Sequence, residues 1–128
     1  LPMALSEGIA VCPYNPLAAG ILSGKYLRGE GGRLDTNKAY QKRYGHEHYP
    51  ETVAAFVAYA QQRNVSPAAL AVAWVTAHPA ITSAIVGTRS LDQFNDTLGC
   101  ADIRLSADER AEIAALSPTP PLATDREA

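Results

Sequence analysis

The stretch Ile81–Asn95 reads ITSAIVGTRSLDQFN and decides the fold class of this chain. Its apolar, β-branched first part predicts a buried strand over residues 81–86, and Gly87 then turns the chain toward a helix that begins near Leu91. Arg89 stands at this turn. A strand that leads through a glycine into a helix N-terminus suits an anionic ligand, because backbone N–H groups, the helix dipole and a guanidinium all favour negative charge.

Arg89 at the turn shares one stripe with three polar residues of the following helix, Gln93, Asp96 and Thr97, because the four recur at helical spacing. One interpretation is a set of side chains that converge on a ligand laid over the helix N-terminus. The other is a solvated helix face with Ser90 as the N-cap, and charged stripes of this kind are common. Spacing alone slightly favours the solvated face, so other parts of the chain are needed to choose between the two.

A second apolar run, Ile9–Cys12, predicts a strand buried on both faces, as in a parallel sheet. The residues from Tyr14 to Gly20 come just past the carboxyl end of that strand, where α/β folds bind ligands. An aromatic face and small residues suit a ligand there, but a tight turn explains the pattern equally well. A charged, glycine-rich loop over about residues 27–50 follows, and long loops in compact domains are commonly functional or disordered.

Helical patterns fill much of the remaining chain. From Glu51, apolar residues recur with the helical period, which predicts an amphipathic helix. The pair Ser66-Pro67 predicts the start of a second helix, which is apolar all round from Ala68 to Trp74 and is therefore expected to be deeply buried. The capping box Ser106-Ala107-Asp108-Glu109 predicts a last helix.

The helix that begins near Leu91 is expected to use Leu91, Phe94 and Leu98 as its core face. Strands and helices therefore alternate, which predicts the α/β class with parallel strands. Two strands do not make a stable doubly wound sheet or a closed barrel. Together with a start at Leu1-Pro2, this predicts the C-terminal portion of a longer protein, with a mobile tail over about residues 118–128.

The composition narrows the classes of protein and partner. The 128 residues are 47% hydrophobic and 19% charged, which allows a core and argues against disorder. The formal net charge of -2 speaks against nucleic acid or an anionic membrane as a partner. Cys12 and Cys100 lie far apart and predict free thiols in a cytoplasmic protein. His46-Glu47-His48 lacks the spacing of a metal site, so no metal is predicted.

Several motifs together resemble the aldo-keto reductases. Tyr14-Asn15-Pro16-Leu17-Ala18-Ala19-Gly20-Ile21-Leu22-Ser23-Gly24-Lys25-Tyr26 is similar to the family segment Y-S-P-L-x-x-G-L-L-T-G-K-Y. The pieces Gly32–Leu34 and Tyr40–Tyr44 resemble the loop that follows it in bacterial members. Ser66–Val75 resembles the penultimate barrel helix, and Ile85–Leu98 matches G-A-R-x-x-x-Q-L-x-E-N-L. The resemblance covers nearly the whole chain, in order and with sensible spacing.

The resemblance implies that residues 1–128 are the C-terminal part of a single (β/α)8 TIM barrel, incomplete on its own, with the two predicted strands as the seventh and eighth. In barrels of this kind, phosphate-binding sites commonly lie after strands 7 and 8. The resemblance also implies that the barrel binds NADP(H) in an extended form, without a Rossmann domain. The cofactor-binding residues implied by matching position are Tyr14, Asn15, Pro16, Leu17, Ala18, Gly20, Lys25, Arg33, Gly87, Thr88, Arg89, Gln93, Asp96 and Thr97.

Matching position also implies individual roles. Tyr14 would stack on the nicotinamide, Lys25 and Arg33 would reach phosphate groups from the loop that covers the cofactor, and Arg89 would hold the 2′-phosphate. The stretch from Asn15 to Gly20 would line the pyrophosphate and ribose path, and the polar stripe beyond Gly87 the adenosine end. At Thr97 the family usually has asparagine, and at Asp96 glutamate. Both replacements keep hydrogen-bonding capacity.

No catalytic residue is expected in this chain, because the family's Asp, Tyr, Lys and His tetrad comes from the first half of the barrel. The intact protein is expected to reduce aldehydes or ketones, its small-molecule carbonyl substrates, by hydride transfer from NADP(H). Two alternatives remain open at this point. One is a non-catalytic, nicotinamide-binding regulatory subunit of the same fold, and the other is an inactive fragment. The sequence does not indicate an oligomeric state.

Overall fold

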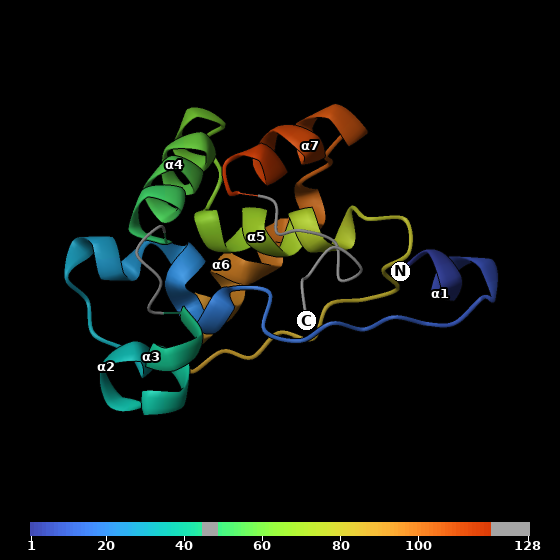
Figure 1. The fold of residues 1–128 in the computed structure, drawn as a ribbon. Helices are drawn as coiled ribbons and strands as arrows, with labels where there is room; N and C mark the ends of the chain where they lie inside the picture. Colours follow the sequence, from blue (N-terminus) through green and yellow to red (C-terminus); the bar gives the residue numbers. More distant parts are fainter. Residues whose placement is uncertain (45–48, 119–128) are drawn as a thin grey trace.

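A computed structural model describes residues 1–44 and 49–118, and in it short and medium helices pack around one central helix, α5 (Pro67–Thr76) (Figure 1). The other helices of the described residues are, in chain order, α1 (Pro2–Ser6), the 3-10 helices η1 (Ala18–Ser23) and η2 (Lys25–Arg28), α2 (Arg33–Thr36), α3 (Lys38–Tyr44), α4 (Tyr49–Gln62), α6 (Leu91–Leu98), the 3-10 helix η3 (Gly99–Asp102) and α7 (Ala107–Ala115). α4 and α7 lie above α5 in this view, α2 and α3 lie at its lower left, and α1 projects at the opposite end.

α5 is capped and buried as the sequence predicts. The Ser66 hydroxyl oxygen accepts hydrogen bonds from the backbone N–H groups of Ala68 and Ala69, at 3.1 and 3.3 Å. Pro67 occupies the first turn, where its missing N–H costs no intrahelical bond. Every residue from Ala68 to Ala73 is buried, because α5 contacts α4, α6, η1 and η3. The prediction of a deeply buried second helix is confirmed.

The hydrophobic core lies where α4, α5 and α7 meet. Phe56 and Ala60 of α4 pack with Leu70 and Ala71 of α5 and with Ile113 of α7. The apolar spacing that predicted an amphipathic helix after Glu51 therefore points at this core, and that prediction is confirmed.

The Trp74 side chain fastens α5 to α7. Its indole N–H donates a hydrogen bond to the backbone oxygen of Arg110 at 2.9 Å. The Arg110 guanidinium also lies over the Trp74 ring, 4.9 Å from its centroid, a favourable cation–π arrangement. The two contacts orient α7 on the outer side of the core.

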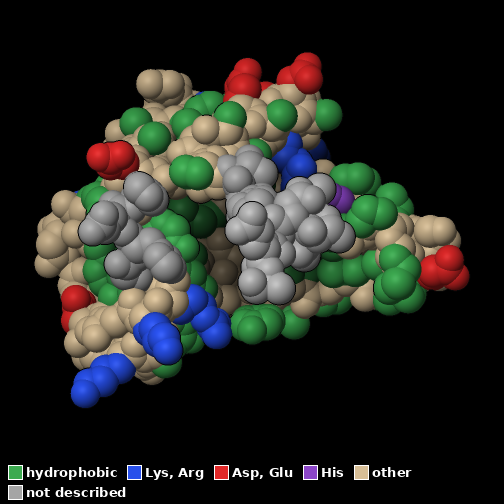
Figure 2. Space-filling model, viewed as in Figure 1, with side chains coloured by type: hydrophobic (Ala, Val, Ile, Leu, Met, Phe, Trp, Pro, Cys, Tyr) green, Lys and Arg blue, Asp and Glu red, His purple; other side chains and the backbone are tan. Residues whose placement is uncertain are grey.

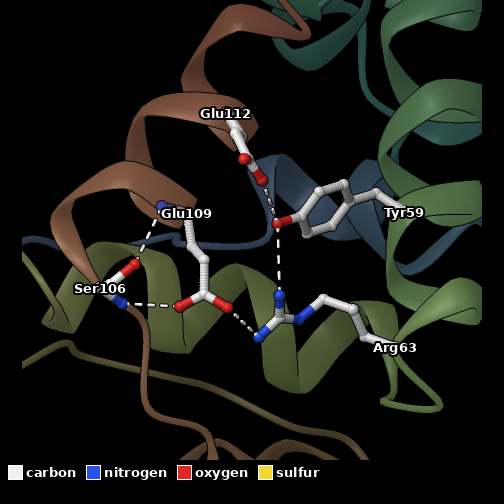
Figure 3. Close-up of polar contacts among 5 residues, drawn as sticks. All are labelled: Tyr59, Arg63, Ser106, Glu109 and Glu112. Atoms are coloured by element: carbon white, nitrogen blue, oxygen red, sulfur yellow. Dashed lines mark hydrogen bonds and ion pairs between the residues drawn. The ribbon is translucent and has the colours of Figure 1, made fainter.

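Polar contacts at the surface join α7 to α4 (Figure 3). The predicted capping box is present, because the Ser106 hydroxyl accepts from the Glu109 N–H at 3.1 Å and the Glu109 carboxylate accepts from the Ser106 N–H at 2.7 Å. Glu109 also pairs with Arg63 at 2.5 Å, and the Tyr59 hydroxyl contacts Glu112 at 3.1 Å. Both partners of the Arg63–Glu109 pair are partly exposed, so water and salt screen the attraction between them.

Acidic pH is expected to weaken this contact. The hydrogen bond from the Ser106 backbone N–H, followed by that from Arg63, holds the pKa of Glu109 below its usual range. A carboxyl whose folded-state pKa is lowered stabilises the fold above its unfolded pKa, and this contribution is lost as the pH falls through the folded-state pKa. Thermal unfolding of the wild type and of Glu109→Gln from pH 7 to pH 3 should show a smaller loss of Tm on acidification in the variant.

The matched control for this prediction is Asp108→Asn, which removes a carboxylate from the same first turn. That variant should lose Tm with acidification nearly as the wild type does. Equal pH profiles for the wild type and Glu109→Gln would contradict the role given to Glu109.

The two predicted strand segments lie side by side and run parallel (Figure 1). The Thr82 N–H donates to the Val11 backbone oxygen at 2.9 Å, and the Ile85 N–H donates to that of Pro13 at 2.8 Å. Tyr14 and Ile85 form an isolated parallel bridge. The parallel direction predicted for the two segments is therefore confirmed, although the described residues contain no β-strand.

The prediction that these two segments are buried strands is wrong for this structure. Ile9 and Ile85 are 52% and 58% exposed, and Cys12, expected in the core, is exposed. A lone pair of extended segments leaves an edge and a face of each open to water, so the continuous ladder of a sheet does not form. Apolar sequence alone could not show whether further segments lie on either side.

The predicted core face of α6 is also wrong. Leu91, Phe94 and Leu98 are 77%, 42% and 50% exposed, whereas Thr97 is only 4% exposed. α6 and η3 approach α5 through small residues, and a Cβ added at Gly99 would lie 3.5 Å from the Ala69 Cβ. The alanine-rich surface of α5 therefore approaches the small residues of α6 and η3, while Leu91, Phe94 and Leu98 stay largely exposed.

The predicted loop over residues 27–50 contains the helices α2 and α3, which the sequence analysis did not expect. The Asn37 side-chain oxygen accepts hydrogen bonds from the N–H groups of Ala39 and Tyr40, at 3.0 and 3.4 Å, and so starts α3. Residues 45–48, and nearly all of the predicted mobile tail at 118–128, lie outside the described residues.

Candidate functional site

A cleft of about 480 Å³ opens between the Tyr14–Lys25 segment and the segment from Ile85 to Thr97. The parallel pairing of the two extended segments places their carboxyl ends side by side, and the cleft begins at those ends. Predicted cofactor-binding residues that line it are Tyr14, Asn15, Pro16, Leu17, Gly20, Lys25, Gly87, Thr88, Arg89, Gln93, Asp96 and Thr97. Lining residues that the sequence analysis did not assign to the site are Ala19, Ser23, Glu30, Gly31, Tyr40, Ala68, Ile85 and Val86.

Two predicted site residues stand apart. Ala18 does not line the cleft, although it belongs to the turn that forms one wall. Arg33 begins α2, and its side chain lies outside the described part of the structure.

The first wall of the cleft is a turn with unusual backbone geometry. Asn15, Ala18 and Ala19 have φ values of 61°, 48° and 62°, and Gly20 follows at 89°. Positive φ is unfavourable for residues with a Cβ, so this turn is strained, and strain of this kind is concentrated at functional sites. The Asn15 side-chain oxygen supports the turn by accepting the Ala19 N–H at 2.9 Å.

Lys25 brings a cation to this wall. A Cβ added at Gly20 would lie 3.1 Å from the Lys25 Cε, so glycine leaves room for the lysine side chain along the turn. The ammonium lies 4.7 Å from the centroid of the Tyr26 ring. Glu30 also lines the cleft but pairs with Arg28 at 2.6 Å, and the hydrogen bond from Arg28 lowers the pKa of Glu30.

The second wall is the turn into α6, and its hydrogen bonds show how it is held. The Ser90 hydroxyl caps α6 by accepting the Gln93 N–H at 3.3 Å. The Gln93 side-chain oxygen accepts the Arg89 N–H at 3.0 Å, which leaves its amide NH₂ and a second lone pair of the oxygen for a ligand. The Thr97 hydroxyl donates to the Gln93 backbone oxygen at 2.7 Å, which leaves Thr97 as an acceptor only.

The charges of the cleft fit an elongated anion. One cation stands on each wall, Lys25 on the first and Arg89 on the second, and the Arg89 side chain is exposed. Asp96 adds an acceptor beyond Arg89. The exposed ring of Tyr14 supplies a flat apolar surface at the junction of the walls. This arrangement supports the ligand interpretation of the polar stripe over a plain solvated face, while binding itself stays a prediction.

Figure 2 shows most of the visible lysine and arginine side chains of this face at the lower left, where Figure 1 draws α2 and α3, and a further basic patch higher up, to the right of the centre. Within the described residues, no group of three or more His, Cys, Asp or Glu side chains could hold a metal ion. His46-Glu47-His48 lies outside that part of the chain. No helix among the described residues is both long and apolar enough to cross a bilayer.

Comparisons with known proteins agree with the motifs that line the cleft. The model of the Aldo/keto reductase family matches residues 1–118. Protein tas of Escherichia coli (strain K12) is 34% identical over 112 residues, which cover 86% of this chain and 32% of that protein. The uncharacterized oxidoreductase YrpG of Bacillus subtilis (strain 168) is 31% identical over 105 residues, 82% of this chain and 31% of the relative. Aldo-keto reductase str7 of Strobilurus tenacellus is 24% identical over 131 residues, 100% of this chain and 39% of the relative.

This chain belongs to the aldo/keto reductase family, and the resemblance drawn from its motifs is confirmed. It spans about a third of the length of the curated relatives it matches. The largely helical structure, without strands in the described residues, fits a fragment of the family fold. Family members are oxidoreductases that typically use NAD(P)H and act on carbonyl compounds.

Proposed function

We propose that this chain forms the NADP(H)-binding part of an oxidoreductase that reduces aldehydes or ketones by hydride transfer. The observation that carries the proposal is the single cleft that unites two distant motif segments, Tyr14–Lys25 and Gly87–Thr97. In the barrel of the intact enzyme, residues 9–12 and 81–86 would be the seventh and eighth strands. Their pairing in parallel supports this assignment.

The residues present fit the cofactor chemically. Lys25 and Arg89 supply positive charge for the pyrophosphate and the 2′-phosphate, and a guanidinium suits a phosphate because it binds through two parallel hydrogen bonds. Tyr14 offers its ring to the nicotinamide. Asp96 and Thr97 offer acceptor oxygens to the adenine amino group.

When bound, the cofactor supplies the hydride, and this chain supplies the binding and orientation. We assign no catalytic residue to this chain. The proton donor is expected to come from the family's Asp, Tyr, Lys and His tetrad, in the part of the family fold outside this chain. A cytoplasmic location stays a prediction from the cysteine content.

The test is a titration of the full-length protein with NADPH, followed through the protein's tryptophan fluorescence. Saturable binding is expected, together with NADPH-dependent reduction of an aromatic aldehyde. Tyr14→Ala should weaken NADPH binding about tenfold or more, because aromatic stacking contributes on the order of 1–3 kcal/mol per base. Tyr59→Ala is the control, because Tyr59 lies in the contact between α4 and α7 and not in the cleft.

The outcomes separate the alternatives. Binding of NADPH without turnover of any carbonyl compound would favour the regulatory subunit. Absence of NADPH binding would refute the proposal.

A further inference from the structure

One long-range hydrogen bond joins the strained turn of the cleft to the helix α3. The Asn15 side-chain NH₂ donates to the Tyr44 hydroxyl oxygen at 2.9 Å, across 29 residues of sequence. Tyr44 is the last residue of α3, and Asn15 lines the cleft. The bond is partly buried, so water competes for it less than at the open surface.

This bond fixes which way the Asn15 amide points. Its oxygen accepts the Ala19 N–H at 2.9 Å, and its nitrogen donates to Tyr44. A flipped amide would face a donor with its NH₂ group and would lose the Ala19 bond. Asn15 also has a φ of 61°, a conformation that its short polar side chain tolerates because it can bond locally.

The Tyr44 ring is itself held in place. It stacks on the Tyr40 ring, with centroids 6.1 Å apart and an interplanar angle of 16°, and its centroid lies 6.4 Å from that of Tyr49. Tyr40 lines the cleft, so the same aromatic row that carries the Tyr44 hydroxyl also forms part of the cleft wall. The ring contacts of Tyr44 therefore hold its hydroxyl in position for the hydrogen bond with Asn15.

We propose that Tyr44 is a positioning residue of the cofactor cleft. It acts through Asn15, supports the turn 15–20, in which Asn15, Ala18 and Ala19 have positive φ, and joins α3 to that turn. The turn is thereby preorganised, and a ligand bound there need not supply the free energy of ordering it. The effect of Tyr44 on NADP(H) binding rests on the proposed function, whereas its support of the turn does not.

The first test therefore uses the full-length protein without cofactor. Amide hydrogen exchange at Ala19 should be about two- to tenfold faster in Tyr44→Phe, the range expected from loss of one hydrogen bond. Phenylalanine keeps the ring and its stacking. Tyr59→Phe is the matched control, because it removes a bonded hydroxyl from the α4–α7 contact. It should leave Ala19 exchange unchanged.

Asn15→Ala supplies the coupling test. In that background the Tyr44→Phe change should have no further effect on exchange across the turn, because the partner amide is already gone. Two results would overturn the proposal: unchanged Ala19 exchange in Tyr44→Phe, or equal acceleration in Tyr59→Phe.

The second test adds NADPH. Tyr44→Phe should raise the Kd for NADPH about two- to tenfold and leave kcat at saturation close to the wild-type value, because Tyr44 is not part of the chemistry. A fall in kcat with unchanged Kd would contradict a positioning role. If the wild type does not bind NADPH at all, the proposed function fails, and the exchange experiment alone decides the role of Tyr44.

Discussion

Replacing Arg89 with alanine in the full-length protein is expected to weaken NADPH binding by about ten- to a hundredfold, the range for a lost charge-assisted hydrogen bond. The guanidinium stands exposed on the α6 wall of the cleft. NADH lacks the 2′-phosphate, so its affinity should change little. Titration of both cofactors against the wild type and Arg89→Ala measures this difference directly.

Two controls sharpen the result. Arg104→Ala removes an exposed arginine whose guanidinium bonds the nearby Ala101 backbone oxygen and lies outside the cleft. It should leave both affinities unchanged. Arg89→Lys keeps the charge but loses the paired donors, so an intermediate loss is expected. Equal losses of NADPH and NADH affinity in Arg89→Ala would refute the 2′-phosphate role.

Replacing Leu70 with alanine is expected to cost about 2–5 kcal/mol of unfolding free energy, through lost burial and the cavity left behind. Leu70 is fully buried at the centre of the core, where α4, α5 and α7 meet. Two members of its core cluster, Ala60 and Ala71, are already small and can fill little of the space. Chemical denaturation of the full-length protein measures the loss.

Leu27→Ala is the comparison, because Leu27 is 47% exposed in η2 and the same atoms are removed. Its cost should be below about 1 kcal/mol, as for surface substitutions generally. Similar losses for the two variants would show that the core does not lie around α5.

The helices could be predicted because their signals are local. Ser66 caps α5, and Ser106 and Glu109 form a capping box at the start of α7. The partners of each contact are fewer than four residues apart in sequence. α3 carried a comparable signal at Asn37, whose side chain caps it, but the surrounding glycines and charges indicated a loop. The Asn37 cap is therefore the local signal that predicts α3.

The strands and the α6 face could not be predicted in the same way. Whether Ile85 or Leu91 is buried depends on what lies against it, and a hydrophobic pattern does not contain that information. Thr97 is buried because α6 packs against the alanine-rich α5. This burial depends on how two helices fit together, which the sequence of α6 alone does not show.

In the candidate site, too, local features could be predicted, whereas contacts between distant segments could not. Motif resemblance brought most of the lining residues together before their geometry was known, because the spacing within each motif is local. The motifs assign Tyr40 and Tyr44 no role at the site. Their place at the cleft, and the bond from Asn15, depend on α3 folding back across 29 residues.

The parallel contact at the base of the cleft also bears on the order of folding. Val11 and Thr82 meet across 71 residues of chain, and closing a loop of that length costs about 4 kcal/mol of entropy. The few backbone bonds between the segments return only about 0.5–1.5 kcal/mol each. We therefore expect the cleft to form only after α4 and α5 have docked and shortened the effective loop. Variants that slow α5 docking should then delay the appearance of the binding site in refolding experiments.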